Sequence, residues 1–330
     1  MLQRFFRYLT RNQVIFAILI VVTGWVMIQI RDILLSFFLS YIIMSSMLPV
    51  VTYLRKKGLP KFFAVAIPYF AMLFAIILLI LPLIPFFATQ TQNLIAKFPL
   101  YFKQALLTLG LSLEANQIQS YLTSEINSIS ENAFTFTTKI FGGLFSFMMI
   151  FIVSFYLLLY YEEFKRLIAR LFHPDTRTDI LSTIDKINGK LGAWLRGQIL
   201  LCLFIGTLSW ICLTALGVPN ALPLALLSGL FEIVPTLGPI LSAIPAVIIA
   251  ITISPTLAIS VAISYVLIQL IENNLLVPKV MEKAVGLNPI VIIMGVLIFS
   301  NLIGLSGALL AIPLITFILV ILKSLDQRQH

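Results

Sequence analysis

The chain has 330 residues, of which 60% are hydrophobic and only 11% are charged. Soluble domains are about 45–50% apolar and about 25% charged, so this composition excludes an ordinary soluble domain. The mean hydropathy of +1.06 instead predicts an all-α polytopic integral membrane protein. The formal net charge of +9 does not indicate a nucleic-acid partner, because the basic residues flank apolar runs and form no separate basic domain.

Apolar runs of membrane-crossing length recur along the chain. A hydrocarbon layer of about 30 Å needs about 17–25 helical residues. The runs that meet this length are Val14–Ile30, Ile33–Val51, Phe62–Phe87, Ile140–Tyr161, Ile199–Leu216 and Thr256–Val277. No small-x-small cleavage pattern follows the first run, so we expect a retained helix and not a signal peptide. With two broken segments nearer the C-terminus, the sequence predicts about eight membrane segments.

The basic residues gather on one side of these runs. That side would hold Arg4, Arg7, Arg11, Arg55, Lys56, Lys57, Lys61, Lys165, Arg166, Arg170, Arg177, Lys186, Lys190, Arg196, Lys279, Lys283, Lys323 and Arg328. The opposite side would keep Arg31, Lys97, Lys103 and Lys139. Because cytoplasmic loops carry the excess of Lys and Arg, both termini are expected in the cytoplasm.

Two stretches between the runs are too polar to cross a membrane. Residues 89–138 are rich in Ser, Thr, Asn and Gln and would lie outside the cytoplasm. Their apolar stripe at helical spacing would rest on the membrane, on the protein's own helices or on another subunit. Residues 162–195 predict two basic amphipathic helices on the inner membrane surface, separated by a turn at His173-Pro174-Asp175. The stripe consists of Ile118, Leu122, Ile129, Ala133, Phe136 and Ile140.

The apolar stretch Ala221–Ile251 contains an acid and a break. Glu232 is followed by Pro235-Thr236-Leu237-Gly238-Pro239. Proline removes a backbone donor and clashes with the preceding turn, so backbone groups here are freed from helical hydrogen bonding. Irregular backbone inside a membrane needs cover from protein or access to water, and an intramembrane acid is a functional candidate. We therefore expect a solute or ion pathway at Glu232, Pro235, Thr236, Gly238 and Pro239. A proline kink in a packing helix is the alternative.

A second polar set ends the run Thr256–Val277. Gln269, Glu272 and Asn273 are spaced by three and four residues, which places them on one helical face. Such a face is unusual in a membrane helix and suggests that it lines the same pathway. Because Glu272 lies near the expected helix end, a side chain that reaches to the inner surface is the alternative.

The last apolar block, Asn288–Leu322, is too long for one untilted crossing and is interrupted at Ser300–Gly307. We add Asn301, Gly304 and Gly307 from this interruption to the pathway. At about 1.5 Å per residue, Glu232 would lie about 17 Å from the outer face and Asn301 about 18 Å from the inner face. The sequence thus predicts two opposed re-entrant or broken-helix hairpins, as in transporters with inverted repeats. Tilted continuous helices are the alternative.

Short motifs in the C-terminal part match a known family. They are Leu195-Arg196-Gly197-Gln198, Leu216-Gly217-Val218-Pro219, Phe231-Glu232-Ile233-Val234-Pro235-Thr236-Leu237-Gly238-Pro239, Ile271-Glu272-Asn273-Asn274-Leu275-Leu276-Val277-Pro278, Val285-Gly286-Leu287-Asn288-Pro289 and Gly304-Leu305-Ser306-Gly307-Ala308-Leu309-Leu310-Ala311-Ile312-Pro313. Through them, the region Leu195–Pro313 resembles the AI-2E (autoinducer-2 exporter) family, also called PerM-like permeases. Ser300-Asn301 departs from the glycine-richer pattern expected before the second turn. The resemblance implies a multi-span transporter of a bacterial inner membrane, in some members exporting autoinducer-2 and in others exchanging Na⁺ for H⁺.

These features divide the chain into five parts. They are N-terminal transmembrane helices (1–87), extracytoplasmic amphipathic helices (88–139), one transmembrane helix (140–161), cytoplasmic amphipathic helices (162–196) and a transport core with broken helices (197–330).

The function that fits best is a gradient-driven secondary transporter, because the sequence has no G-x-x-x-x-G-K-[ST] phosphate loop and no soluble domain for ATP hydrolysis. The resemblance suggests export of a small polar solute such as autoinducer-2. A Na⁺(Li⁺)/H⁺ antiporter and a non-transporting membrane scaffold are the alternatives. We expect no enzyme, since the runs contain no Ser/His or Asp/Asp constellation. We expect no cofactor or metal, and the expected partners are the solute, H⁺ or Na⁺, membrane lipids and further copies of the chain in a homo-oligomer.

Overall fold

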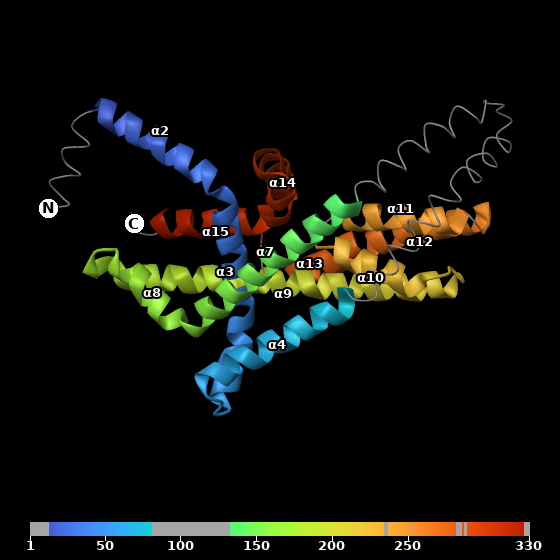
Figure 1. Ribbon diagram of the computed structural model, residues 1–330, viewed down its shortest axis with the longest axis horizontal. Helices are drawn as coiled ribbons and strands as arrows, with labels where there is room; N and C mark the ends of the chain where they lie inside the picture. The colour runs from blue at the N-terminus through green and yellow to red at the C-terminus, as the bar shows by residue number, and fades with distance from the viewer. Residues whose placement is uncertain are drawn as a thin grey trace.

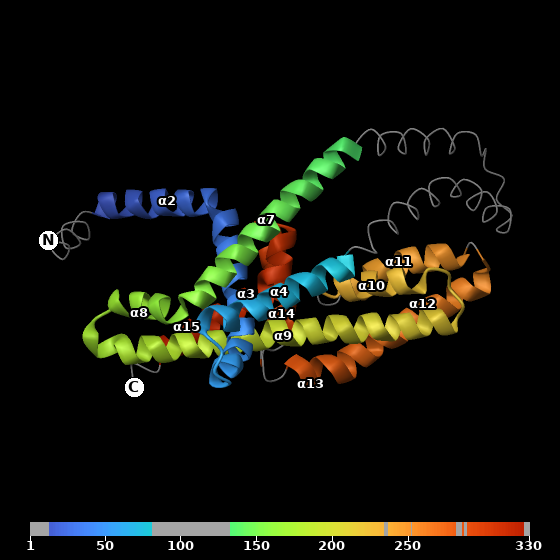
Figure 2. The same cartoon turned by 60° about the horizontal axis from the view of Figure 1, so that its bottom comes forward.

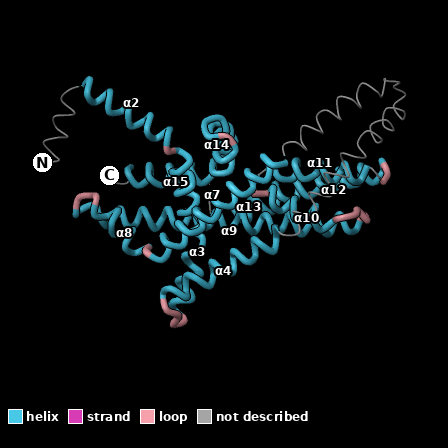
Figure 3. The backbone as a smooth tube through the Cα atoms, in the orientation of Figure 1, coloured by secondary structure: helices cyan, strands magenta, loops and turns pink. Residues whose placement is uncertain are grey.

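The computed structural model of the chain describes residues 13–80, 133–233, 237–251, 253–281, 286 and 289–326. Within these ranges the regular structure is helical and the connections are short turns (Figure 3). The predicted all-α class is therefore confirmed. The extracytoplasmic stretch predicted over residues 88–139 lies outside the described residues, except that a helix begins within it at Ala133.

In the first part of the chain, four helices match predicted apolar runs and a fifth matches a predicted amphipathic segment. They are α2 (Gln13–Gln29), α3 (Arg31–Lys56), α4 (Lys61–Ile80), α7 (Ala133–Leu159) and α8 (Tyr161–Arg170). The chain bends by 78° between α7 and α8. α8 is the predicted basic amphipathic helix, and a 3₁₀ turn at Pro174–Thr176 follows it where the turn was expected.

The next helix continues through the predicted boundary near residue 196. We expected a surface helix that ends near Leu195 and a separate span from Ile199, whereas α9 runs without a break from Arg177 to Ala215. Its 39 residues extend about 58 Å at 1.5 Å per residue. The charge of Arg196 suggested a membrane surface. In the structure Arg196 is exposed, and its guanidinium donates to the Ser46 carbonyl oxygen at 3.0 Å, a contact with α3.

The C-terminal part consists of shorter helices with clear end signals. They are α10 (Ala221–Phe231), α11 (Leu237–Ile251), α12 (Pro255–Ile271), the π-helical turn η2 (Glu272–Leu276), α13 (Val277–Met281), α14 (Pro289–Ile303) and α15 (Leu305–Asp326). Ser254 caps α12 by accepting from the Leu257 N–H at 3.1 Å, with Pro255 in the first turn. Gly304, at φ +68°, makes the turn between α14 and α15.

α9 is the central helix, on which most of the other described helices pack (Figure 1). α3, α8 and α15 pack along its N-terminal part, α10 and α12 pack along its C-terminal part, and α11 packs on α10 and α12 (Figure 2). α10 runs back along α9, α11 reverses again beside α10, and α12 returns in the direction of α10. The turns at both ends of α11 therefore place the C-terminal ends of α10 and α12 near the middle of the molecule.

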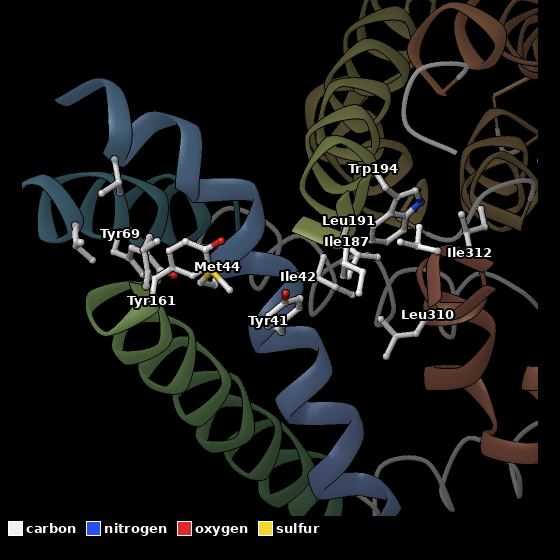
Figure 4. Close-up of a cluster of buried hydrophobic side chains, with 14 of the residues drawn as sticks. Tyr41, Ile42, Met44, Tyr69, Tyr161, Ile187, Leu191, Trp194, Leu310 and Ile312 are labelled. Atoms are coloured by element: carbon white, nitrogen blue, oxygen red, sulfur yellow. The ribbon is translucent and has the colours of Figure 1, made fainter. Parts of the chain in front are cut away.

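Two apolar clusters hold these parts together. The first joins α3, α4, α7, α8, α9 and α15 around Ile42, Leu191 and Trp194 (Figure 4). At its edge Asn188 of α9 donates to the Tyr161 hydroxyl at 2.8 Å and accepts from Ser45 Oγ at 3.0 Å. The second cluster joins the C-terminal part of α9 to α10, α11 and α12. α9 thus passes from one cluster into the other, and residues 198–209 lie between them.

Five helices in the described ranges are long and apolar enough to cross a membrane, or six if the bent pair α7 and α8 is one span. The five are Arg31–Lys56, Lys61–Leu79, Pro174–Ala215, Pro255–Val280 and Leu305–Asp326. α10, with 11 residues, extends only about 17 Å, about half of a crossing. It packs against α11 as an antiparallel hairpin, so residues 221–251 are not one kinked helix. The chain is a multi-pass membrane protein, and the count of eight segments stays a prediction.

Candidate functional site

Two buried carboxyl groups meet near the middle of the molecule. Glu232 directly follows α10, and Glu272 is the first residue of the π-helical turn after α12. Their exposed fractions are 0% and 1%. The two carboxyls lie within hydrogen-bonding reach of each other. The sequence predicted both acids separately, and the structure brings them together.

Two glutamines hold this carboxyl pair in place. Gln198 of α9, 1% exposed, donates from Nε2 to the backbone carbonyl oxygen of Glu232 at 2.6 Å. Gln269 of α12 donates from Nε2 to Glu272 Oε2 at 3.3 Å. Gln269 was among the predicted site residues. Gln198 was not, although it lies in one of the motifs that carry the family resemblance.

The site is rich in oxygen atoms that lack a donor. Both Glu232 carboxyl oxygens, Gln198 Oε1 and Gln269 Oε1 are buried and accept no hydrogen bond from any residue that the structure describes. Unpaired buried polar groups cost about 1–3 kcal/mol each, and more when charged. This arrangement therefore favours species that fill acceptors: a proton shared by the two carboxyls, a cation, or a solute with several donors.

Close backbone contacts set the position of Glu232. α10 crosses α9 at Gly229, where an added Cβ would lie 2.7 Å from the Cys202 carbonyl oxygen. At the other end of the break, a Cβ on Gly238 would lie 2.6 Å from the Glu232 backbone nitrogen. Only glycine permits approaches this close. Gly238, predicted as a pathway residue, thus serves to fold the start of α11 against Glu232.

The π-helical turn places Glu272. Pro278 has no N–H for the preceding turn, and the wider π-helical pattern at residues 272–276 precedes it. Asn274 Nδ2 donates to the Leu270 carbonyl oxygen at 2.8 Å, so a side chain provides a hydrogen bond to the backbone in this segment. The helix continues through this turn into α13, so Glu272 is not at a free helix end and points inward. Asn273, predicted on the same face, is exposed.

A cluster of hydroxyl groups lies one helical turn from the carboxyl pair. Tyr265 of α12 shares a hydrogen bond of 2.9 Å with Ser228 of α10. Ser242 of α11 and Ser209 of α9 lie within reach of the same tyrosine hydroxyl. All three serines are 0% exposed and Tyr265 is 4% exposed. The sequence analysis missed this hydroxyl cluster, although Ser228 precedes Glu232 by four residues and Tyr265 precedes Gln269 by four.

The remaining predicted residues fall outside this site or outside the described residues. Pro235 and Thr236 are not described, and Pro239 lies in the first turn of α11. Asn301, Gly304 and Gly307 belong to the α14–α15 hairpin, in which Asn301 is exposed and Gly307 packs directly on the Phe299 carbonyl oxygen. α14 packs on α15, away from the α10–α12 bundle (Figures 1 and 2). The structure therefore does not join these three residues to the carboxyl pair.

Long apolar helices around a buried, acceptor-rich carboxyl pair define a multi-pass membrane protein of the kind that moves solutes or ions. Comparison with known proteins gives the family. The family model for AI-2E family transporters matches residues 15–327, and the chain belongs to this family. The family is one of transporters.

Individual relatives carry transport names. The chain is 26% identical over 304 residues to YueF of Bacillus subtilis (strain 168), named a candidate transport protein, covering 86% of this chain and 82% of YueF. It is 30% identical over 175 residues to the candidate permease PerM of Escherichia coli (strain K12), covering 52% and 49% of the two chains. It is 21% identical over 307 residues to the AI-2 transport protein TqsA of the same strain, covering 88% and 86%.

Proposed function

We propose that the protein is a gradient-driven secondary transporter in which the Glu232–Glu272 pair couples movement of a small polar solute to movement of protons. The observation that carries this proposal is the contact between two fully buried carboxyls, of which both Glu232 oxygens accept no hydrogen bond from the described residues. Two contacting carboxylates repel each other strongly where water is excluded, so the closed, empty pair retains a proton. The charge state of the pair is therefore a property of both residues together.

Coupling follows from exchange of that proton. When the site opens to water, or when a cation or a donor-rich solute fills the acceptor oxygens, the shared proton leaves to solvent. When the bound species leaves on the other side, the pair must take up a proton again before it closes. A gradient of protons can then drive the solute in the opposite direction without any covalent chemistry.

The solute that we propose is autoinducer-2 or a similar small polar molecule, with export as the direction. Support comes from the name of TqsA and from the family. Hydroxyl groups on such a solute would donate to the oxygens of Glu232, Gln198 and Gln269 that otherwise lack donors. We also propose a bacterial inner membrane as the location, with both termini in the cytoplasm, on the basis of the basic residues described above.

A Na⁺(Li⁺)/H⁺ antiporter is the second candidate, and one observation favours it. Carboxylate and amide carbonyl oxygens are the ligands that hard cations prefer, and the free oxygens of Glu232, Gln198 and Gln269 supply both kinds. A bare cation would replace the proton on the pair directly. The two candidates share the site and differ in the species that exchanges with H⁺.

A gradient screen in reconstituted vesicles tests these proposals. Purified protein in proteoliposomes is given outward gradients of sodium, lithium or autoinducer-2, and internal pH is followed with a trapped dye. We expect one solute to drive proton entry in wild type and in Glu163→Gln, a control at an exposed acid on α8. We expect no proton entry with Glu232→Gln. Flux of none of the three in wild type would contradict the proposal and favour a scaffold.

A further inference from the structure

The hydroxyl cluster of Ser209, Ser228, Ser242 and Tyr265 has no evident role in holding the carboxyl pair. Its four members come from four different helices, α9 to α12, and are almost completely buried. The side chains around it are those of the second apolar cluster, which includes Leu213, Leu224, Ala246 and Val261. Four hydroxyls gathered in apolar surroundings cost free energy unless they bond to one another, so their position is a specific feature of this bundle.

The hydroxyl cluster lies between the carboxyl pair and one end of the bundle. Ser228 is one turn before Glu232 on α10, about 6 Å along the helix axis. Ser209 is six residues before the end of α9 at Ala215, about 9 Å along the axis. By the distribution of basic residues, this end of α9 faces away from the cytoplasm. The hydroxyl cluster therefore lies on the side of the carboxyl pair that is expected to face outward.

We propose that the hydroxyl cluster is a proton relay that connects the outer surface to the Glu232–Glu272 pair. This proposal rests on the proposed function. A proton from outside bonds to one hydroxyl oxygen while that group releases its own proton to the next, so each hydroxyl gains one proton and loses one. The last transfer forms an O–H bond on a carboxylate oxygen of the pair. The bound solute or cation leaves toward the outside before this transfer, and no oxidant or other reactant is needed.

The chemistry of the cluster suits this role. A hydroxyl both donates and accepts, which a relay requires of every member. The Tyr265 hydroxyl has one proton but three serine neighbours, and Ser209 Oγ makes no good hydrogen bond in the described structure, so the bonding pattern can be rearranged. Ser228 and Glu232 are one helical turn apart, about 6 Å along the axis, so one bridging water or solute hydroxyl would connect them.

Few other titratable groups face this path. Cys212 of α9 lies near Tyr265, and Cys202 of α9 lies near the carboxyl pair. Both cysteines are on α9, and among the described residues no charged side chain interacts with Tyr265. The proton can therefore move through the cluster without meeting a fixed charge before the pair.

Tyr265→Phe tests the relay because it removes one hydroxyl and keeps the ring. Tyr69→Phe is the matched control: Tyr69 is also buried and hydrogen-bonded to a serine, Ser154 Oγ at 2.5 Å, but it lies between α4 and α7. Two rates are measured in proteoliposomes with whichever of sodium, lithium or autoinducer-2 is active in the screen. One is exchange at equal pH, and the other is flux driven by an imposed pH gradient.

We expect Tyr265→Phe to slow the flux driven by the pH gradient by at least about a hundredfold, the lower end of the range for loss of a proton-transfer group. Exchange at equal pH and the melting temperature should stay close to those of Tyr69→Phe. Equal loss of both rates in Tyr265→Phe would overturn the relay and indicate a packing or solute-binding role. If Tyr265→Phe does not fold, Ser209→Ala gives the same test at the unpaired hydroxyl.

Glu232→Gln separates failure of the relay from failure of the proposed function. If Glu232→Gln keeps its response to the pH gradient, the proposed function fails and the relay fails with it. If Glu232→Gln loses the response and both Tyr265→Phe and Ser209→Ala keep it, the carboxyl pair couples transport and the relay alone is wrong.

Discussion

The close crossing of α9 and α10 provides a prediction whose size follows from the coordinates. An alanine Cβ at Gly229 would lie 2.7 Å from the Cys202 carbonyl oxygen, whereas ordinary contacts begin at 3.4 Å. The helices would have to separate locally by about 0.7 Å, and overpacking of this kind costs about 1–3 kcal/mol. Alanine recovers about 1 kcal/mol over glycine within a helix. Gly229→Ala should therefore lower stability by up to about 2 kcal/mol.

The same crossing offers a matched control on the facing helix. An alanine Cβ at Gly206 would meet its nearest neighbour, the Ala225 carbonyl oxygen, at 3.4 Å, an ordinary contact. Gly206→Ala should therefore be neutral or stabilising by up to about 1 kcal/mol. The prediction concerns the difference between two identical substitutions within one helix pair, so differences in unfolded-state entropy largely cancel.

Gly229→Ala should also impair transport more than Gly206→Ala does. A shift of α10 by about 0.7 Å would stretch the 2.6 Å bond from Gln198 to the Glu232 carbonyl oxygen toward the limit of useful hydrogen bonding. Thermal melts in detergent and solute flux in vesicles measure the two effects. We expect Gly229→Ala to melt lower and to transport more slowly than Gly206→Ala. Equal melting temperatures and equal flux in the two variants would refute the proposed packing.

Three further predictions concern single side chains. Gln198→Leu should destabilise the protein by about 1–3 kcal/mol, because the buried Glu232 carbonyl oxygen loses its donor. Its solute flux should fall further than the loss of folded protein, measured by the thermal melt, accounts for. Asn188→Leu removes two buried hydrogen bonds far from the carboxyl pair and should lower the melting temperature while leaving the response to pH gradients unchanged. The pKa of Glu163 is lowered by a hydrogen bond from its own backbone N–H and, to a smaller extent, by Lys61. A lowered pKa stabilises the fold above the ordinary glutamate value of about 4.3, so wild type and Glu163→Gln should melt most differently at neutral pH and converge in acid.

The sequence was sufficient to predict the class of fold and the two acids. Apolar runs and their flanking basic residues identified the long helices, and Glu232 and Glu272 stood out because acids are costly in apolar segments. Their contact was not predictable in the same way. The contact depends on α11 running antiparallel to α10 and on α12 running in the same direction as α10. The residue spacing within a single helix does not predict such a tertiary arrangement.

The differences between the prediction and the structure also have physical causes. Arg196 marks the predicted boundary because a charge in an apolar segment usually lies at the membrane surface, whereas α9 continues through this residue as one helix. Arg196 itself is exposed and donates to a backbone carbonyl of α3. Hydroxyl residues such as Ser228 and Tyr265 carry no charge and are common in apolar helices, so nothing in the sequence distinguishes them as site residues. Asn301 did signal a polar site, yet α14 packs on α15 and leaves it exposed, away from the carboxyl pair.

The most direct test of the account is the flux driven by an imposed pH gradient in Glu232→Gln, Glu272→Gln and the double variant. Glutamine keeps the shape and hydrogen bonds of a protonated glutamate but cannot release the proton. Because the two carboxyls act as one unit, we expect each single variant to assemble, to retain exchange at equal pH and to lose acceleration by the gradient, with the double variant no worse than either. Wild-type flux with unchanged pH dependence in Glu232→Gln would contradict the account and make Glu232 a packing residue.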